Sequence, residues 1–310
     1  MVAAMIAAAL FTGAVAVQAA REERFPQPAP AEQVLYVTST AAAQRLALSY
    51  RALAGDVYWI RAIQYFGGAR RRLVDEERLG ILPPPALAAD VSDYDLLYPL
   101  LDLTTALDPR FHIAYRFGAT FLAELYPEGA GRPDLAVALL EKGLAAQPNR
   151  WEYMQDIGFV HYWWRHDYAA AAEWFDRAAG VPGAPWWLRS LAATTLAQGG
   201  DRQSSRTMWQ AIRESAEIDW LLQDSERRLR QLDALDQLDQ LQAAVDAFAA
   251  RTGAPPPGWG ALVRAGALPG TPVDPTGMPY ELRNGRARLA TASSLYPLPD
   301  EPIASAAPAP

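Results

Sequence analysis

Three histidines and no cysteine limit the chemistry that this chain could perform. His161 and His166 lie five residues apart in one helical stretch, with Asp167 next to the second. Metal-binding pairs on a helix are spaced by three or four residues, so this spacing does not favour a metal site. We interpret His161 as a packed residue in the place of an aromatic one, and His166 as a residue that faces solvent.

Other catalytic patterns are also missing from the sequence. It contains no glycine-rich phosphate loop, no Gly-x-Ser-x-Gly turn and no His-Glu-x-x-His helix. The lack of cysteine excludes disulfides, thiolate zinc sites, iron–sulfur clusters and cysteine nucleophiles. Acidic pairs such as Asp93/Asp95 have no neighbour in the sequence that would raise a carboxyl pKa. The sequence therefore predicts a protein that is not an enzyme and needs no cofactor or metal.

The amino-acid composition is that of a chain with enough hydrophobic residues to bury a core. Of its 310 residues, 51% are hydrophobic and 20% are charged, which suits two ordinary domains or one extended array. The net charge of −7 disfavours a broad basic surface, so no nucleic-acid partner is expected. Ten tryptophans and thirteen tyrosines are many for an acidic chain, and they raise the question of what they bind or pack against.

The chain has a helical pattern from about residue 38 to residue 251. Helices are predicted at 38–53, with Ser39 or Thr40 as N-cap, at 56–66, ended by Gly67-Gly68, and at 94–107. The prolines at 83–85 are expected to break the helical pattern and to open a loop.

A small–large–small triplet recurs along the middle of the chain. Its members are Ala136, Leu140 and Gly143, then Ala171, Phe175 and Ala178, then Ser205, Trp209 and Ile212. The spacing within each triplet is four and then three residues, and successive triplets lie about 35 residues apart. Such a pattern is typical of a helix face that a neighbouring helix approaches closely.

Each triplet follows a second helix with its own mark, Phe117-Gly118, Ile157-Gly158 or Ala192-Ala193. Together with the closing prolines Pro109 and Pro148, these residues resemble the tetratricopeptide repeat, a helix–turn–helix unit of 34 residues. The resemblance places full units at about 111–149, 150–183 and 184–217, with a degenerate unit before them. It implies a superhelix whose concave groove binds peptides or proteins.

The aromatic residues divide between this repeat packing and candidate contacts. Trp174, Phe175 and Trp209 stand at or beside the packing positions and are expected in the core. Two adjacent residues of a helix cannot face the same core, so one member of Trp163-Trp164 and one of Trp186-Trp187 should lie near a surface. The candidate partner-binding residues are Tyr162, Trp163, Trp164, Trp186 and Trp187. The alternative is that the second ring of each pair caps the next repeat or packs under a loop.

A long helix is predicted at 218–251, with apolar residues at spacings of three and four from Leu229 to Phe248. The three-residue steps drift too fast around the helix for a heptad seam, so packing against its own domain is favoured over a self-associating coiled coil. Asn284-Gly285 between two short alternating runs predicts a β-hairpin.

The stretch from Val273 through Asp274, Pro275, Gly277, Pro279 and Tyr280 to Leu282 resembles the globular end of type II secretion pseudopilins. The resemblance covers about 238–290 and implies a small antiparallel sheet after a helix. Thr276 stands where those families carry an aromatic residue, and the chain lacks the N-terminal assembly motif of pilins. A convergent turn before a hairpin is the alternative.

The first twenty residues carry no charge and nine of them are alanine, which fits a signal peptide or a membrane anchor. We therefore expect a location in the cell envelope, membrane-anchored or periplasmic, with membrane contact through this segment. A buried N-terminal helix of a soluble domain is the alternative.

Taken together, the sequence predicts a mainly α fold, with a helix–turn–helix superhelical array and a small C-terminal α+β hairpin module. The expected segments are an anchor or signal at 1–20, a proline-rich spacer at 21–37, the array at 38–217, a bridging helix at 218–251, a cap at 252–290 and a disordered Ala/Pro tail at 291–310. The expected function is a scaffold that holds a protein or peptide partner in an envelope assembly, related to secretion or pili. Two alternatives stay open: a permanent subunit or assembly factor of a membrane complex, and an enzyme with a site between array and cap.

Overall fold

The computed structural model describes residues 11–18, 20–21, 24, 35–80 and 93–301. These residues are mainly helical, with one small antiparallel sheet, and the chain divides into two compact units, Met1–Leu135 and Ala136–Pro310. Residues 11–18 are helical and exposed. Most of the expected spacer at 21–37, the expected loop at Pro83–Pro85 and the end of the tail lie outside the described residues.

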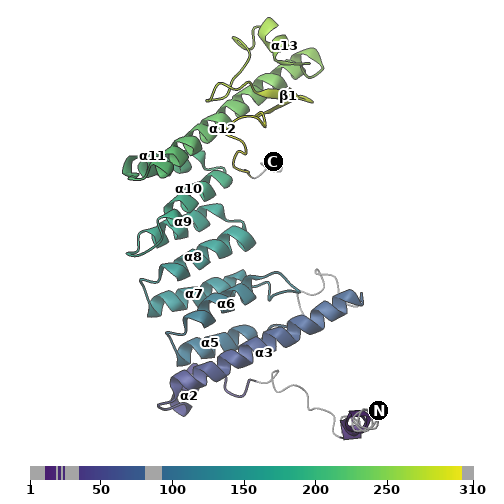
Figure 1. Ribbon diagram of the computed structural model, residues 1–310, viewed down its shortest axis with the longest axis vertical. Coiled ribbons are helices and arrows are strands. Elements are labelled where there is room, and N and C mark those ends of the chain that lie inside the picture. The colour runs from purple at the N-terminus through teal and green to yellow at the C-terminus, as the bar shows by residue number, and fades with distance from the viewer. Residues whose placement is uncertain (1–10, 19, 22–23, 25–34, 81–92, 302–310) are drawn as a thin grey trace, which may run out of the picture. The chain divides into compact units, whose positions relative to one another are not determined.

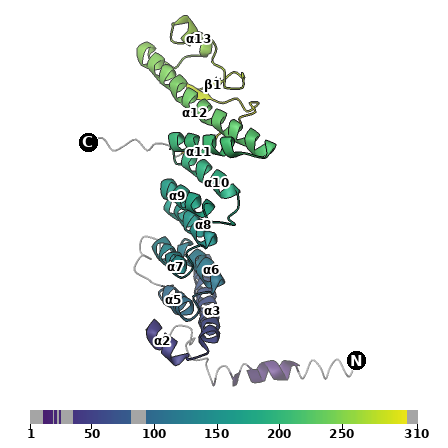
Figure 2. The same ribbon diagram turned by 90° about the vertical axis from the view of Figure 1, so that its left-hand side faces the viewer.

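The first unit is built from α2 (Thr40–Leu46), α3 (Arg51–Arg78), α5 (Leu97–Leu107) and α6 (His112–Ala123). The Ser39 side chain accepts a hydrogen bond from the amide of Ala42 at the start of α2, which confirms the predicted N-cap. Figures 1 and 2 show α3 running alongside α5. A group of rings joins α3 to α6, with Phe66 stacked on Phe121 at a centroid distance of 4.2 Å.

The predicted boundaries in this region were wrong in two places. The expected helix 38–53 is interrupted between α2 and α3, where Leu48 takes a positive φ of 48°. The helix expected to end at Gly67-Gly68 instead continues through them to Arg78. Ala62, Ala69 and Leu73 are buried on one side of α3, so the packing face continues past the two glycines and keeps them helical.

The second unit begins within α7 (Pro133–Ala146) and continues through α8 (Trp151–Val160), α9 (Tyr168–Ala179), α10 (Trp187–Gln198) and α11 (Arg202–Ser215). From α8 onward each helix packs on the next, as Figure 1 shows. Asp167 and Asp201 cap α9 and α11 by accepting hydrogen bonds from the amides of Ala170 and Ser204.

The recurring small–large–small positions are all buried in α7, α9 and α11. Phe175 and Trp209, the large members of the second and third triplets, are at most 2% exposed, so their predicted core position is confirmed. Trp174, also expected in the core, is only partly buried: its ring packs against the cluster around Phe175 and lies under the Arg177 guanidinium at 3.9 Å. Ser205, which replaces alanine in the third triplet, donates its hydroxyl hydrogen to the carbonyl of Ala193 at 2.7 Å.

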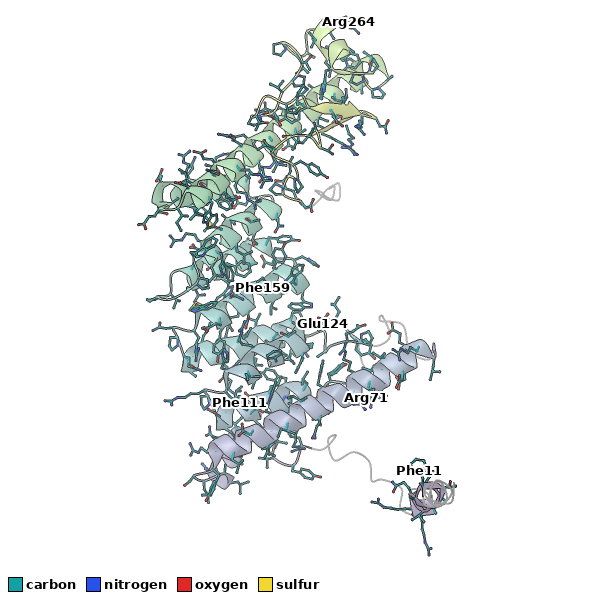
Figure 3. The ribbon with its side chains drawn as sticks, viewed as in Figure 1. Phe11, Arg71, Phe111, Glu124, Phe159 and Arg264 are labelled. Carbon is teal, nitrogen blue, oxygen red and sulfur yellow. The ribbon has the colours of Figure 1, made fainter. Side chains whose placement is uncertain are left out.

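Gly158 lies where α8 approaches α9 too closely for a side chain. An added Cβ at Gly158 would lie 2.4 Å from Cε1 of Phe175, whose ring occupies that space. Phe159, labelled in Figure 3, packs edge-on against the same ring at a centroid distance of 5.1 Å. The close approach of α8 to α9 therefore depends on one specific glycine and one specific ring.

The predicted long helix is α12 (Asp219–Thr252), which ends at Gly253 in the left-handed conformation. Leu232 and Leu235 pack with Trp209 and Ile212 of α11. Leu241 and Val245 pack in a separate cluster with residues of the C-terminal module. The prediction that this helix packs against its own domain is thus confirmed.

The C-terminal module consists of α13 (Trp259–Arg264) and a hairpin of β1 (Glu281–Arg283) and β2 (Arg286–Arg288). Asn284 and Gly285 both have positive φ, 52° and 71°, so the predicted hairpin and its turn are confirmed. Gln242 of α12 holds the hairpin through hydrogen bonds with the amide of Ala287 and the carbonyl of Gly285.

The prediction of a disordered Ala/Pro tail at 291–310 is wrong for the part of it that the structure describes, residues 291–301. Leu295 is 1% exposed, and the buried amide of Gln231 donates to the carbonyls of Leu295 and Pro297 at 2.8 and 2.7 Å. The Ala/Pro-rich composition of this stretch predicts disorder, but composition does not reveal single contacts. Burial of Leu295 and the two hydrogen bonds from Gln231 hold the segment against α12. Residues 302–310 lie outside the described range.

Asp274 organises the turn before the hairpin, and we predict that it makes the module sensitive to acid. Its buried carboxylate accepts hydrogen bonds from the Thr276 amide and hydroxyl, the Met278 amide and the Ser293 hydroxyl. Burial raises the pKa of Asp274, but these donors outweigh burial and leave the pKa below its ordinary value. This contribution to stability is complete above the unfolded-state pKa of about 4 and is lost as pH falls through the folded-state pKa.

Asp274→Ala is therefore expected to lower the free energy of unfolding at pH 7 by about 2 kcal/mol, since it leaves the donors of Thr276 and Ser293 without an acceptor. Urea unfolding at pH 7 and at pH 3 measures the effect. The variant should also lose less stability than the wild-type protein between these two pH values. An equal loss in both proteins would show that the carboxylate does not carry this pH dependence.

Candidate functional site

Three of the predicted partner-binding residues, Tyr162, Trp163 and Trp164, lie in a π-helical turn, η2 (His161–Arg165), that continues α8. The wider turn ends at His166, which has a positive φ of 51°, and the amides of His166 and Asp167 both donate to the carbonyl of His161. The i→i+5 bonding of a π-helical turn adds a residue to the turn, and consecutive side chains in it still point to different sides of the helix axis. The turn therefore sends neighbouring aromatic residues in different directions.

Tyr162 is mainly a packing residue. Its hydroxyl donates to Oε1 of Gln198 at 2.7 Å, which ties η2 to the end of α10, and its ring contacts Trp163 and Tyr168 edge-on. Burial raises the pKa of the Tyr162 hydroxyl. Trp163 is 60% exposed and Trp164 is partly buried, so one member of this pair lies at the surface, as predicted.

His161 is buried beneath the same turn, in agreement with its interpretation as a packed residue. Burial lowers its pKa and so does the nearby Arg165, while Asp167 and Glu141 act in the opposite direction. Its Nδ1 lies 3.8 Å from an Asp167 carboxylate oxygen, beyond hydrogen-bond distance. His166 is exposed, and within the described parts of the chain no group of three or more His, Asp or Glu residues could hold a metal ion.

Trp186 and Trp187 lie at the start of α10 and are both exposed. The Trp186 ring meets the Trp220 ring of α12 edge-on, at a centroid distance of 4.8 Å, although the two side chains are 59% and 47% exposed. Ile218 precedes Trp220 at the N-cap of α12 and is also exposed. We call Trp186, Trp187, Ile218 and Trp220 the Trp186 patch.

Acidic residues surround the α12 side of the Trp186 patch. Glu214, Glu217 and Asp219 are exposed within a few residues of Trp220, and Arg213 is the one basic residue among positions 213–224. On the α10 side the exposed Arg189 follows Trp187 by two residues. On the α12 side, an apolar centre with an acidic margin fits a partner surface that is apolar at its centre and basic at the facing edge.

The sequence alone did not identify Trp220 or Ile218 as part of this site. The leucine pattern of 218–251 indicates only the packed face of the helix, and Trp220 in the first turn lies outside that pattern. A large aromatic residue at the exposed start of a helix, outside the leucine stripe, was the available signal. The structure places Trp163 and Trp186 in different ring pairs, one with Tyr162 and one with Trp220.

Comparison with known proteins finds no matching family model, no matching curated protein and no matching solved structure. Among the described residues, no helix combines the length and the apolar character that crossing a bilayer requires.

Proposed function

We propose that this chain is a non-enzymatic scaffold of tetratricopeptide type, which binds a protein partner through its second unit. Support comes from the burial of every small–large–small position in α7, α9 and α11, and from the ordered packing of α8 to α11. Repeats of this kind bury their helix faces against one another and leave their remaining surface for partners.

The observation that carries the proposal is the contact between Trp186 and Trp220. Two tryptophans that are more than thirty residues apart in the sequence meet, while each keeps about half of its side-chain surface in water, 59% and 47%. Exposed tryptophans held in a fixed arrangement are the typical anchors of protein interfaces. The acidic margin favours a partner with an apolar centre and basic edges.

The proposed location is the cell envelope. It rests on the uncharged N-terminal segment and on the resemblance of residues 238–290 to pseudopilin ends. The assembly that the scaffold serves is then one of secretion or pilus type, in which a small α+β module at the end of a long helix would stand beside related modules.

The double variant Trp186→Ser/Trp220→Ser tests the proposal. Because both side chains are largely exposed, we expect little loss of stability, whereas loss of two anchors should weaken partner binding by about thirtyfold or more. Affinity purification of the full chain from native membranes, with quantitative mass spectrometry, measures the partner recovered. Phe117→Ser, which removes an exposed ring from the first unit, is the matched control and should keep the partner.

Equal recovery of the partner by the double variant and the wild-type protein would contradict the proposal. Recovery of the wild-type protein as a soluble monomer with no stoichiometric partner would do the same.

A further inference from the structure

The first unit carries an apolar helix face that no other element covers among the described residues. Leu53, Val57 and Ile60 of α3 lie within about 60° of one another around the helix and are 60%, 50% and 52% exposed. Ala62 and Ala69 lie on the opposite side of α3 and are buried. The helix is therefore apolar on both sides in its first half, although only one side packs against the unit.

The segment that leads into α3 extends this apolar surface. Tyr36, Leu46, Leu48 and Tyr50 are all more than two-thirds exposed. We call these four residues with Leu53, Val57 and Ile60 the α3 apolar face. Single exposed apolar residues are ordinary on a protein surface, but seven within 25 residues of one chain segment mark an interaction surface.

The charge of the same segment is opposite to that of the whole chain. Residues 35–78, up to the end of α3, contain seven arginines and four acidic residues and so carry a net charge of +3, while the chain carries a net charge of −7. Arg71 follows Leu53 by five helical turns and so lies at the same angle around α3; it is exposed and is labelled in Figure 3. The Arg61 guanidinium lies over the rings of Tyr36 and Tyr58, at 5.5 Å from each centroid.

From this combination we infer that the α3 apolar face lies on the surface of an anionic lipid bilayer. Amphipathic helices that bind membranes place aliphatic side chains among the acyl chains and arginines at the headgroups. Tyrosines are enriched at this boundary, which matches the exposed Tyr36 and Tyr50. An earlier short helix of the same unit also exposes Phe11, Val15 and Val17.

A bilayer explains these observations better than an acidic protein partner does. Leu53, Val57 and Ile60 share one side of α3, and Arg71 follows them on that side with Arg70 next to it, which is the order that a lipid boundary requires. This membrane contact is independent of the Trp186 patch, which belongs to the other unit. It deepens the proposed envelope location and leaves the partner-binding proposal untouched if it fails.

Flotation of the full chain with phosphatidylcholine vesicles, with and without phosphatidylglycerol, tests the inference. We expect binding to the anionic vesicles that weakens with added salt. Leu53→Ser/Val57→Ser/Ile60→Ser should reduce the partition coefficient by at least about tenfold, since the variant loses three aliphatic side chains that would insert among the acyl chains. Arg70→Gln/Arg71→Gln should reduce it by about tenfold on anionic vesicles and leave neutral vesicles unaffected.

Ile113→Ser/Phe117→Ser is the matched control, because it removes two exposed apolar side chains from α6 of the same unit. It should bind vesicles as the wild-type chain does. Wild-type binding by both the triple and the arginine variants would overturn the inference and would assign all membrane contact to the N-terminal segment. The inference would also be overturned if the wild-type chain did not bind vesicles but co-purified with a stoichiometric acidic protein that the triple variant had lost. That result would identify the α3 apolar face as a protein-binding surface.

Discussion

Replacement of Phe175 by alanine is expected to lower the free energy of unfolding of the second unit by about 4 kcal/mol. The ring is fully buried, packs edge-on against Phe159 and occupies the space above Gly158. Alanine would leave a cavity between α8 and α9 that neither helix backbone could fill without losing other contacts. Chemical denaturation, followed by tryptophan fluorescence, measures the loss.

Gly158 supplies a sharper test of the same contact, with Gly67 as its control. Gly158→Ala should destabilise the protein by about 1–3 kcal/mol, because the new methyl group meets a ring that is fixed in the core. Gly67 is also inside a helix but has open space around an added Cβ, so Gly67→Ala should stabilise by about 1 kcal/mol. Effects of the same sign at both glycines would contradict the packing described for α8 and α9.

The second large effect is expected at Arg202. Its guanidinium binds both carboxylate oxygens of Glu301, at 2.6 and 2.5 Å, and also reaches Asp236 and Asp239 of α12. These acidic groups hold the pKa of Arg202 far above its ordinary value. Arg202→Met keeps the length of the side chain but leaves three carboxylates without their common cation.

We expect Arg202→Met to cost about 2–3 kcal/mol, less than a fully buried ion pair, because Asp236 and Asp239 remain partly in water. The same variant should release the segment around Glu301 to limited proteolysis. Arg283→Met removes an exposed ion pair with Glu281 and serves as the control, with an expected cost below about 1 kcal/mol. Equal costs for the two arginines would show that the Arg202 network adds nothing beyond a surface pair.

Regular spacing made the helical core predictable. The triplets around Leu140, Phe175 and Trp209 and the leucines of α12 depend on positions three or four residues apart, and such positions share a helix face in any helix. Local turn chemistry was equally informative at Asn284-Gly285, where both residues accept positive φ.

Features that depend on distant contacts were missed. Gly67-Gly68 reads as a helix end, yet the buried Ala69 and Leu73 keep α3 helical beyond it. The segment after residue 290 reads as a tail, yet Gln231 and Arg202 bind it. Trp220 was missed as a site residue because nothing in its neighbourhood of the sequence indicates that Trp186 lies beside it.

A photo-crosslinking amino acid at position 186 of the full chain, expressed in its native cells, tests the central claim most directly. We expect one specific protein to be crosslinked from position 186 and from position 220, and none from the exposed Asp176 of α9. The crosslinked protein should contact the site through apolar residues with basic neighbours. Crosslinking that is equally diffuse from positions 186, 220 and 176 would contradict the proposal that the Trp186 patch binds a partner.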